Sequence, residues 1–284
     1  MDRYIKSPLN YVGGKYKILS QILPLFPKKV DYFIEPFCGG LNVMANFNGE
    51  INIANDINDY LIEMYEYFKN TPVSELIKKI DEKIKFYNLS LSNAEGYNSL
   101  RNDYNQNKNP LDLFVLTCYS FNHQIRYNNN FKFNTPFGKD RSSYNATIKK
   151  NLILFVEKIQ SLSISFSNKQ FFDIDYSMLT SDSFVYCDPP YLISIGSYND
   201  GKRGFGNWTE KEEKMLLELL DELNSKGTKF ALSNVLIHKG VKNDILIEWA
   251  KKYKVHYINN NFNNSNYQSC AKEHETIEVL ITNY

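Results

Sequence analysis

Short apolar runs alternate with amphipathic stretches at both ends of the chain, and this alternation restricts the fold more than any other feature. Between Thr209 and Gly227 the pattern is that of a helix, since Thr209 and Glu212 form a capping-box pair and Gly227 lies where the chain would leave it. The runs that have the length and composition of buried strands are 32–37, 51–56, 184–188, 229–234, 255–258 and 278–282. Because strands that alternate with helices build parallel sheets, the sequence predicts an α/β fold with a mostly parallel sheet and covering helices.

The middle third of the chain has a different pattern. Apolar residues recur at helical spacing from Ile57 to Phe68 and again from Val73 to Ile84. Residues 122–141 follow, where hydrophobic residues alternate around an Asn-rich turn and a proline interrupts the run, which predicts a hairpin or a long loop. We therefore expect an α/β domain made of residues 1–57 and 149–284, with a helical and hairpin insertion over 58–148.

The charge of the chain is unevenly distributed. The 284 residues sum to a net charge of +1, which excludes a globally basic nucleic-acid coat protein. Residues 1–30 nevertheless carry six Lys or Arg against one Asp, and residues 119–150 also carry six against one. Two basic tracts on a nearly neutral chain favour a localised anionic partner over general adhesion to polyanions.

The cysteines and the apolar segments exclude other classes of protein. Cys38, Cys118, Cys187 and Cys270 lie far apart, with no Cys-x-x-Cys pair and no histidine at zinc spacing, so we expect free thiols and no metal site. The chain lacks a signal-peptide pattern and an apolar run long enough to span a membrane. These features predict a cytoplasmic protein without membrane association, and we expect it to be monomeric in solution.

The strongest chemical signal is Asp188-Pro189-Pro190-Tyr191, which directly follows the buried apolar run 184–187 (FVYC). Ligands of open α/β sheets bind beyond the carboxyl ends of strands. A carboxylate followed by a proline-fixed carbonyl offers two rigid hydrogen-bond acceptors, which suit a planar NH₂ group, and Tyr191 offers a stacking surface for the ring that carries it. Taken alone, the tripeptide Asp188-Pro189-Pro190 is more typical of a strand that ends in a proline-rich turn.

With this tetrapeptide the sequence begins to resemble the Dam-type DNA adenine-N6 methyltransferases, and the match continues across nearly the whole chain. Residues 33–40 (FIEPFCGG) resemble the family's FxGxG loop, and residues 11–15 (YVGGK) resemble its short N-terminal motif. Asn55-Asp56 stands where the family has the acidic residue that follows the second strand. The T-even phage members resemble this sequence pattern more than the chromosomal bacterial ones do. The resemblance implies a class I S-adenosylmethionine-dependent methyltransferase fold, which is Rossmann-like.

The resemblance also implies roles for individual residues around S-adenosylmethionine. Tyr11 would lie against the adenine ring of the cofactor with Lys15 beside it, and Asp56 would hold the ribose hydroxyls. Phe172-Asp173 would flank the cofactor base, or pack as a strand-end aromatic. The implied cofactor-binding residues are Tyr11, Lys15, Glu35, Phe37, Gly39, Gly40, Asp56, Phe172, Asp173 and Asp188.

The implied catalytic set is Asp188, Pro189, Pro190 and Tyr191. Asp188 and the Pro189 carbonyl would each accept one N6–H of an adenine that has left the duplex, and Tyr191 would stack on that base. Adenine N6 would then attack the methyl group of the cofactor in line, without a covalent enzyme intermediate and without a metal.

In the same way, residues 58–148 are expected to form a target-recognition domain for double-stranded DNA, with GATC as the implied sequence and a restriction–modification system as one setting. Arg126 would read a guanine, and Phe121 would fill the gap left by the flipped adenine. The sequence departs from the family pattern at Asn10, where some relatives have a basic residue. Phosphate contacts suit Lys132, Lys139 and Arg141 better. The implied DNA-binding residues are Phe121, Asn122, Arg126, Lys132, Asn134, Pro136, Lys139 and Arg141.

Two alternatives from other classes remain open. A methyltransferase acting on protein glutamine or on RNA also uses an xPPY motif, although such enzymes generally lack a basic central insertion. A DNA-binding protein that has lost catalysis is the other alternative, and the intact motifs argue against it. Trp208 lies on a helical segment and is expected to be a packing residue.

Overall fold

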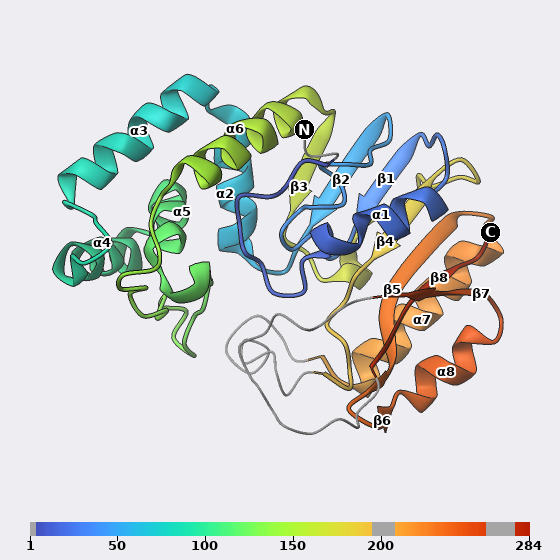
Figure 1. Ribbon diagram of the computed structural model, residues 1–284. Helices are drawn as coiled ribbons and strands as arrows, with labels where there is room; N and C mark the ends of the chain where they lie inside the picture. The colour runs from blue at the N-terminus through green and yellow to red at the C-terminus, as the bar shows by residue number, and fades with distance from the viewer. Residues whose placement is uncertain (1–3, 195–207, 260–275) are drawn as a thin grey trace.

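The computed structural model describes residues 4–194, 208–259 and 276–284, and within them eight strands form one sheet (Figure 1). The strands are β1 (Tyr32–Glu35), β2 (Ile51–Asn55), β3 (Ile164–Ser167), β4 (Phe184–Cys187), β5 (Lys229–His238), β6 (Val241–Lys242), β7 (Lys254–Ile258) and β8 (Ile277–Thr282). Their order is β3-β2-β1-β4-β5-β8-β7, with β6 paired to β5. Strands β1 to β5 run parallel, and β8 lies antiparallel between β5 and β7. The predicted mostly parallel sheet is therefore confirmed.

Helices precede β1 and occupy several of the segments between the strands. The helical elements are η1 (Lys15–Ile18), α1 (Leu19–Ile22), η2 (Leu23–Leu25), α2 (Asp59–Asn70), α3 (Val73–Phe86), α4 (Ala94–Asn107), α5 (Pro110–Tyr119), η3 (Phe121–His123), α6 (Ala146–Ser161), η4 (Phe171–Asp173), α7 (Glu210–Ser225) and α8 (Asp244–Ala250). In α7 both halves of the predicted capping box are present, and Gly227 follows the helix with a positive φ of 79°. The start and the end of this helix are therefore as predicted.

The sheet has a separate hydrophobic core on each face, because successive side chains of a strand point to opposite sides. Phe33 of β1 and Phe184 of β4 pack on one face, together with α1 and the helices of the insertion. Ile34 and Val185, the next residue in each strand, pack on the other face against α7 and α8. This two-sided covering explains why the central strands appear in the sequence as unbroken apolar runs.

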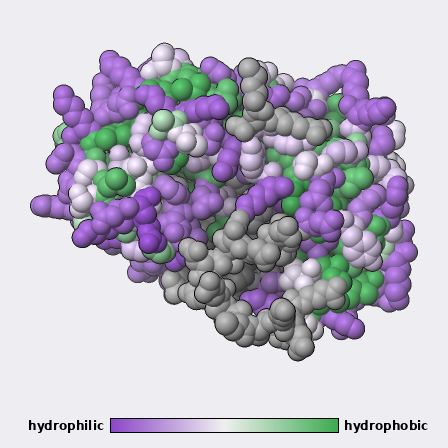
Figure 2. All heavy atoms as spheres, viewed as in Figure 1, coloured by the Kyte–Doolittle hydropathy of each residue, from purple (hydrophilic) through white to green (hydrophobic). Residues whose placement is uncertain are grey.

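The insertion is continuous with the first of these cores. Helices α2 and α6 lie beside the sheet, while α3, α4 and α5 extend away from it (Figure 1). Helix α5 is buried along nearly its whole length, and its Leu116 belongs to the same cluster of buried residues as Phe33. Hydrophilic residues cover much of the face in Figure 2, where the hydrophobic ones form separate patches. The division into residues 58–148 and the remainder stays a prediction.

The predicted hairpin is present as a short, irregular ribbon. Isolated antiparallel bridges join Ser120 to Phe137 and Tyr127 to Phe133. Asn128 forms the turn, since its backbone N–H donates to the Lys132 carbonyl at 2.9 Å and its side-chain oxygen accepts from the Lys132 N–H at 3.0 Å. The side chain of an asparagine thus replaces part of the backbone ladder that a regular hairpin would have.

Candidate active site

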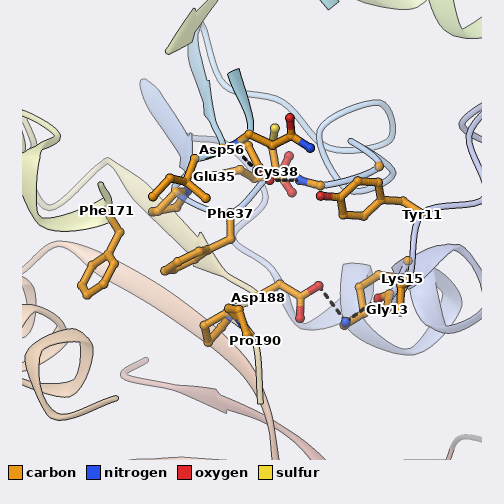
Figure 3. A pocket seen from close by; sticks show the side chains of 18 of the residues that line it. Tyr11, Gly13, Lys15, Glu35, Phe37, Cys38, Asp56, Phe171, Asp188 and Pro190 are labelled. Carbon is orange, nitrogen blue, oxygen red and sulfur yellow. Dashed lines mark hydrogen bonds and ion pairs between the residues drawn. The ribbon is translucent and has the colours of Figure 1, made fainter. Parts of the chain in front are cut away.

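A cavity of about 260 Å³ lies at the carboxyl ends of β1, β2 and β4, where parallel strands deliver the residues that follow them. The N-terminal motif closes the cavity from the side, as Figure 3 shows for Tyr11, Gly13 and Lys15. Most of the predicted cofactor and catalytic residues therefore come together here. Those that line the cavity are Tyr11, Lys15, Glu35, Phe37, Gly39, Gly40, Asp56, Asp188, Pro189 and Pro190.

Lys15 and Asp188 form an ion pair inside this cavity. Lys15 Nζ lies 2.6 Å from Asp188 Oδ2 and donates to the Gly13 carbonyl at 2.7 Å, and its side chain is only 6% exposed. A turn closed by the Gly14 N–H and the Tyr11 carbonyl at 3.1 Å places Lys15 at the first position of η1. Burial raises the pKa of Asp188 above its ordinary value, and the neighbouring ammonium of Lys15 opposes this rise.

The glycine loop after β1 is fastened to Asp56. The Gly39 N–H donates to Asp56 Oδ2 at 2.9 Å, while Asp56 Oδ1 accepts from the Asn58 N–H at 3.0 Å. Gly39 has a positive φ of 44°, and a Cβ at this position would lie 3.1 Å from the Tyr11 ring. A glycine is therefore required by both the backbone and the close approach of Tyr11. Burial raises the pKa of Asp56, opposed by its two backbone hydrogen bonds.

A second carboxyl group, Glu35, lies at the inner end of the cavity. Its side chain is 2% exposed and accepts from the Met44 N–H at 3.1 Å. Burial raises the pKa of Glu35 well above its ordinary value, and the negative charge of Asp188 adds to the rise. Glu35 thus keeps its proton to a higher pH than an exposed glutamate would.

Three aromatic rings form one wall of the cavity. The ring centre of Phe37 lies 5.4 Å from that of Phe171 and 5.5 Å from that of Trp208, and the Phe171 and Trp208 centres are 5.6 Å apart. Trp208 Nε1 donates to Glu213 Oε2 at 2.7 Å, which fixes the plane of the indole. Trp208 packs, as expected, but it also lines the cavity. We call Phe37, Phe171 and Trp208 the aromatic wall.

Phe172 and Asp173 were expected beside the cofactor, but neither is among the residues that line the cavity, so that role stays a prediction. Both residues lie in the short turn η4, where Phe171 is 3% exposed and faces the cavity while Phe172 is 45% exposed. Asp173 does not line the cavity either, and Lys169 and Gln170 do. A one-turn 3₁₀ segment has no periodicity, so the sequence pattern does not distinguish between two adjacent phenylalanines.

Tyr191 does not line the cavity, although it follows Asp188 and both prolines. Its hydroxyl oxygen lies within hydrogen-bond distance of both Asp188 Oδ1, at 3.2 Å, and Glu278 Oε1, at 3.4 Å, and Lys15 Nζ lies 5.3 Å from the centre of its ring. The ring is 8% exposed. Its role as a stacking surface for a base therefore stays a prediction.

The hairpin reaches the cavity through two side chains that were not predicted, Ile125 and Tyr127. Arg126, between them, is half-buried and donates from its guanidinium to the side-chain oxygen of Gln124. Asn10 Nδ2 donates to the Asn122 carbonyl at 2.9 Å, so the N-terminal motif is bonded to this segment. The other predicted DNA-binding residues are exposed: Phe121, Asn122, Lys132, Asn134, Pro136, Lys139 and Arg141.

The sequence profile of the D12 class N6 adenine-specific DNA methyltransferases matches residues 11–264, from the N-terminal motif to beyond Asp188-Pro189-Pro190-Tyr191. The chain belongs to this family. The resemblance to the Dam-type enzymes is thereby confirmed, and the mostly parallel sheet is that of a class I S-adenosylmethionine-dependent methyltransferase.

Named relatives of this D12 chain include restriction–modification enzymes and Dam. The type II methyltransferase M.FokI of Planomicrobium okeanokoites is 51% identical over 283 residues, which cover 100% of this chain and 43% of M.FokI. The modification methylase StsI of Streptococcus sanguinis is 49% identical over 284 residues, with 99% and 43% covered. The DNA adenine methylase of Escherichia coli K12 is 29% identical over 260 residues, with 88% and 86% covered. The chain thus spans less than half the length of the first two relatives, and the likeness to phage enzymes stays a prediction.

Other features bear on the remaining expectations. In the part of the chain that the structure describes, no three His, Cys, Asp or Glu side chains are grouped so as to hold a metal ion. Cys38, Cys118 and Cys187 are free and buried, and Cys270 lies outside the described residues. Among the described helices, none has both the length and the apolar character needed to cross a membrane.

Proposed function

We propose that this chain transfers a methyl group from S-adenosylmethionine to N6 of an adenine in double-stranded DNA. The observation that carries the proposal is the convergence of Asp188, the Gly39 loop and Asp56 on one cavity at the carboxyl edge of the sheet. These groups belong to three motifs that are far apart in the sequence, and all three motifs line the same cavity.

The residues present fit the proposed cofactor. The aromatic wall offers the flat apolar surface that a purine needs, and Asp56 offers carboxylate oxygens to ribose hydroxyls. The glycine loop lets a ligand approach the backbone closely. The ion pair of Lys15 and Asp188 lies on the side of the cavity away from Phe171 of the aromatic wall (Figure 3). We therefore place the cofactor's adenine against the aromatic wall instead of against Tyr11. When bound, S-adenosylmethionine supplies an electrophilic methyl group.

Asp188 is the acceptor for the adenine amino group in this proposal. Its carboxylate and the Pro189 carbonyl would each accept one N6–H, which draws the nitrogen lone pair away from the ring and towards the methyl group. The Lys15 ion pair keeps Asp188 charged although burial disfavours the charge. Positioning and fixed charges thus account for the catalysis, and no covalent intermediate is needed.

The adenine has to leave the duplex to reach Asp188, at a cost of about a few kcal/mol. Phe121 is exposed on the hairpin segment, and Ile125 and Tyr127 join that segment to the cavity wall. We propose that Phe121 fills the gap in the duplex while the hairpin delivers the base. Around it, the exposed cations Lys132, Lys139 and Arg141 would bind phosphates.

The target sequence belongs to the same proposal. The Dam resemblance implies GATC, with Arg126 as the residue that reads a guanine through its bidentate fork. The hydrogen bond to Gln124 holds the Arg126 guanidinium in one orientation, which favours reading a base over a diffuse phosphate contact. The two relatives with the higher identities are named a type II methyltransferase and a modification methylase, so the experiment must not assume the target sequence in advance.

The deciding experiment is to express the chain in a host without DNA methylation and to sequence the genomic DNA with detection of N6-methyladenine. We expect methylation of adenine in one recurring sequence, with GATC as the predicted one. A different recurring sequence would overturn GATC alone. A protein-glutamine or RNA methyltransferase would leave the DNA unmodified but would still transfer label from the cofactor to a protein or RNA extract. A chain that binds DNA and transfers no label would be a binding protein without activity.

A further inference from the structure

The buried carboxylate of Glu278 lies beside the proposed active site although it does not line the cavity. Glu278 is on β8, where it pairs with Val235 of β5 and Ile258 of β7, and it is 5% exposed. Burying a carboxylate is unfavourable unless it is hydrogen-bonded. Its placement next to the catalytic carboxylate therefore calls for a function that an apolar side chain would not supply.

The hydroxyl of Tyr191 lies between two carboxylates. It is 3.2 Å from Asp188 Oδ1 and 3.4 Å from Glu278 Oε1. A phenol has a single proton, so Tyr191 donates to one of these oxygens at a time. The other Asp188 oxygen, Oδ2, is bonded to Lys15 at 2.6 Å. When Tyr191 donates to Asp188, both oxygens of the catalytic carboxylate are occupied.

The proposed reaction needs Asp188 as an acceptor for the adenine amino group, and the following step rests on that proposed function. A carboxylate oxygen that already accepts a hydrogen bond is a weaker acceptor for a second donor. We propose that Glu278 is a positioning residue that accepts the hydrogen bond of Tyr191 when an adenine occupies Asp188. The hydroxyl then leaves Asp188 Oδ1 open to N6–H, and the Tyr191 ring stays in place.

The negative charge of Glu278 acts in the same direction as this geometry. Glu278 lies near enough to Asp188 that its charge contributes to the raised pKa of Asp188, although burial contributes more. A more basic carboxylate is a stronger hydrogen-bond acceptor. Glutamine at this position would keep an acceptor oxygen for Tyr191 and remove the charge, whereas leucine would remove both.

A double-mutant cycle tests the proposal. The rate constant of methyl transfer is measured at saturating S-adenosylmethionine and saturating DNA for Glu278→Leu and Glu278→Gln, each in the parent chain and in Tyr191→Phe. We expect Glu278→Leu to lower the rate constant by about tenfold in the parent, the size of one hydrogen bond to a charged group, and Glu278→Gln to restore most of it. In Tyr191→Phe, which lacks the hydroxyl, we expect Glu278→Leu to have little further effect.

Leu280→Ala on the same strand is the matched control, because this residue is fully buried and lies outside the cavity. We expect it to lower the melting temperature and to leave the rate constant of the folded enzyme unchanged. The proposal is overturned if Glu278→Leu transfers methyl groups as fast as the parent. It is also overturned if Glu278→Leu lowers the rate constant by the same factor in the parent and in Tyr191→Phe. A parent chain that methylates no adenine would instead overturn the proposed function, and this inference with it.

Discussion

At the residue scale, the proposed chemistry depends on one carboxylate that is shielded from water and paired with a cation. The side chain of Asp188 is 19% exposed, and Lys15 lies 2.6 Å away and offsets part of the penalty of burying its charge. Lys15 itself is held by the Gly13 carbonyl, so the position of the cation is fixed by the turn that precedes η1. A sequence motif that looks like a plain glycine turn thus determines the electrostatics of a residue far along the chain.

Replacing Asp188 by Ala is expected to abolish methyl transfer, because the adenine amino group loses its charged acceptor. Asp188→Asn keeps one acceptor oxygen and is expected to retain slight activity. Single-turnover transfer of label to DNA measures both, and circular dichroism checks that both variants are folded. A near-normal rate for Asp188→Ala would show that another group accepts the N6 protons.

The raised pKa of Asp188 gives the reaction a defined dependence on pH. The proposed methyl transfer needs the ionised carboxylate. Its rate is therefore expected to be highest above the pKa of Asp188 and to fall as the pH drops through that pKa. Lys15 lowers this pKa, and therefore Lys15→Met is expected to move the acid limb of the rate profile to higher pH. The matched control is Lys17→Met, since Lys17 is exposed on the same short helix. An acid limb that stays in place in Lys15→Met would assign the limb to another group.

At the scale of elements, the strands that carry the site were predictable and the turns between them were less so. Strands β1 and β4 are buried along nearly their whole length, so they appear as mostly apolar runs, and the motif residues follow directly after them. Strand β2 is only partly buried, and asparagines interrupt its apolar residues. Strand β3 was missed because its sequence, ISFS, alternates serine with two apolar residues and has no continuous apolar run.

Side chains brought in from distant elements could not be predicted in the same way. Trp208 reaches the cavity because Glu213 fixes its indole, and Glu278 reaches Asp188 because β8 is inserted between β5 and β7. Both depend on the order of strands in the sheet, which local patterns do not encode. The choice of Phe171 over Phe172 depends on the dihedral angles of a single turn.

The hairpin carries the prediction about sequence recognition. Arg126→Ala is expected to cost about 1–3 kcal/mol on the preferred site and to relax discrimination at one base pair only. Lys139→Ala removes an exposed cation beyond the ribbon. We expect it to weaken binding to all DNA sequences alike and to make the affinity less dependent on salt concentration. Methylation rates on the preferred site and its single-base variants distinguish the two. An unchanged ranking of sites in Arg126→Ala would remove Arg126 from the recognition set.

At the scale of the whole molecule, a single cluster of buried residues extends from the sheet into the insertion. Phe33 of β1, Phe155 of α6 and Tyr104 of α4 all belong to it. An insertion that shares its core with the main sheet is not expected to fold or melt alone. We therefore predict one calorimetric unfolding transition, with equal calorimetric and van't Hoff enthalpies. Two separate transitions would show that residues 58–148 are an independent folding unit.

The hydrogen bond from Asn10 to the Asn122 carbonyl has a consequence for attempts to exchange specificity between relatives. The bond joins the first motif of the chain to the ribbon 112 residues later. A chimera that receives only a foreign ribbon keeps the Asn10 donor of this chain but replaces the segment that carries its acceptor, the Asn122 carbonyl. Exchanging specificity would therefore mean transplanting two pieces of sequence: the ribbon itself and the residues around position 10, which are distant from the ribbon in the sequence but contact it in the fold.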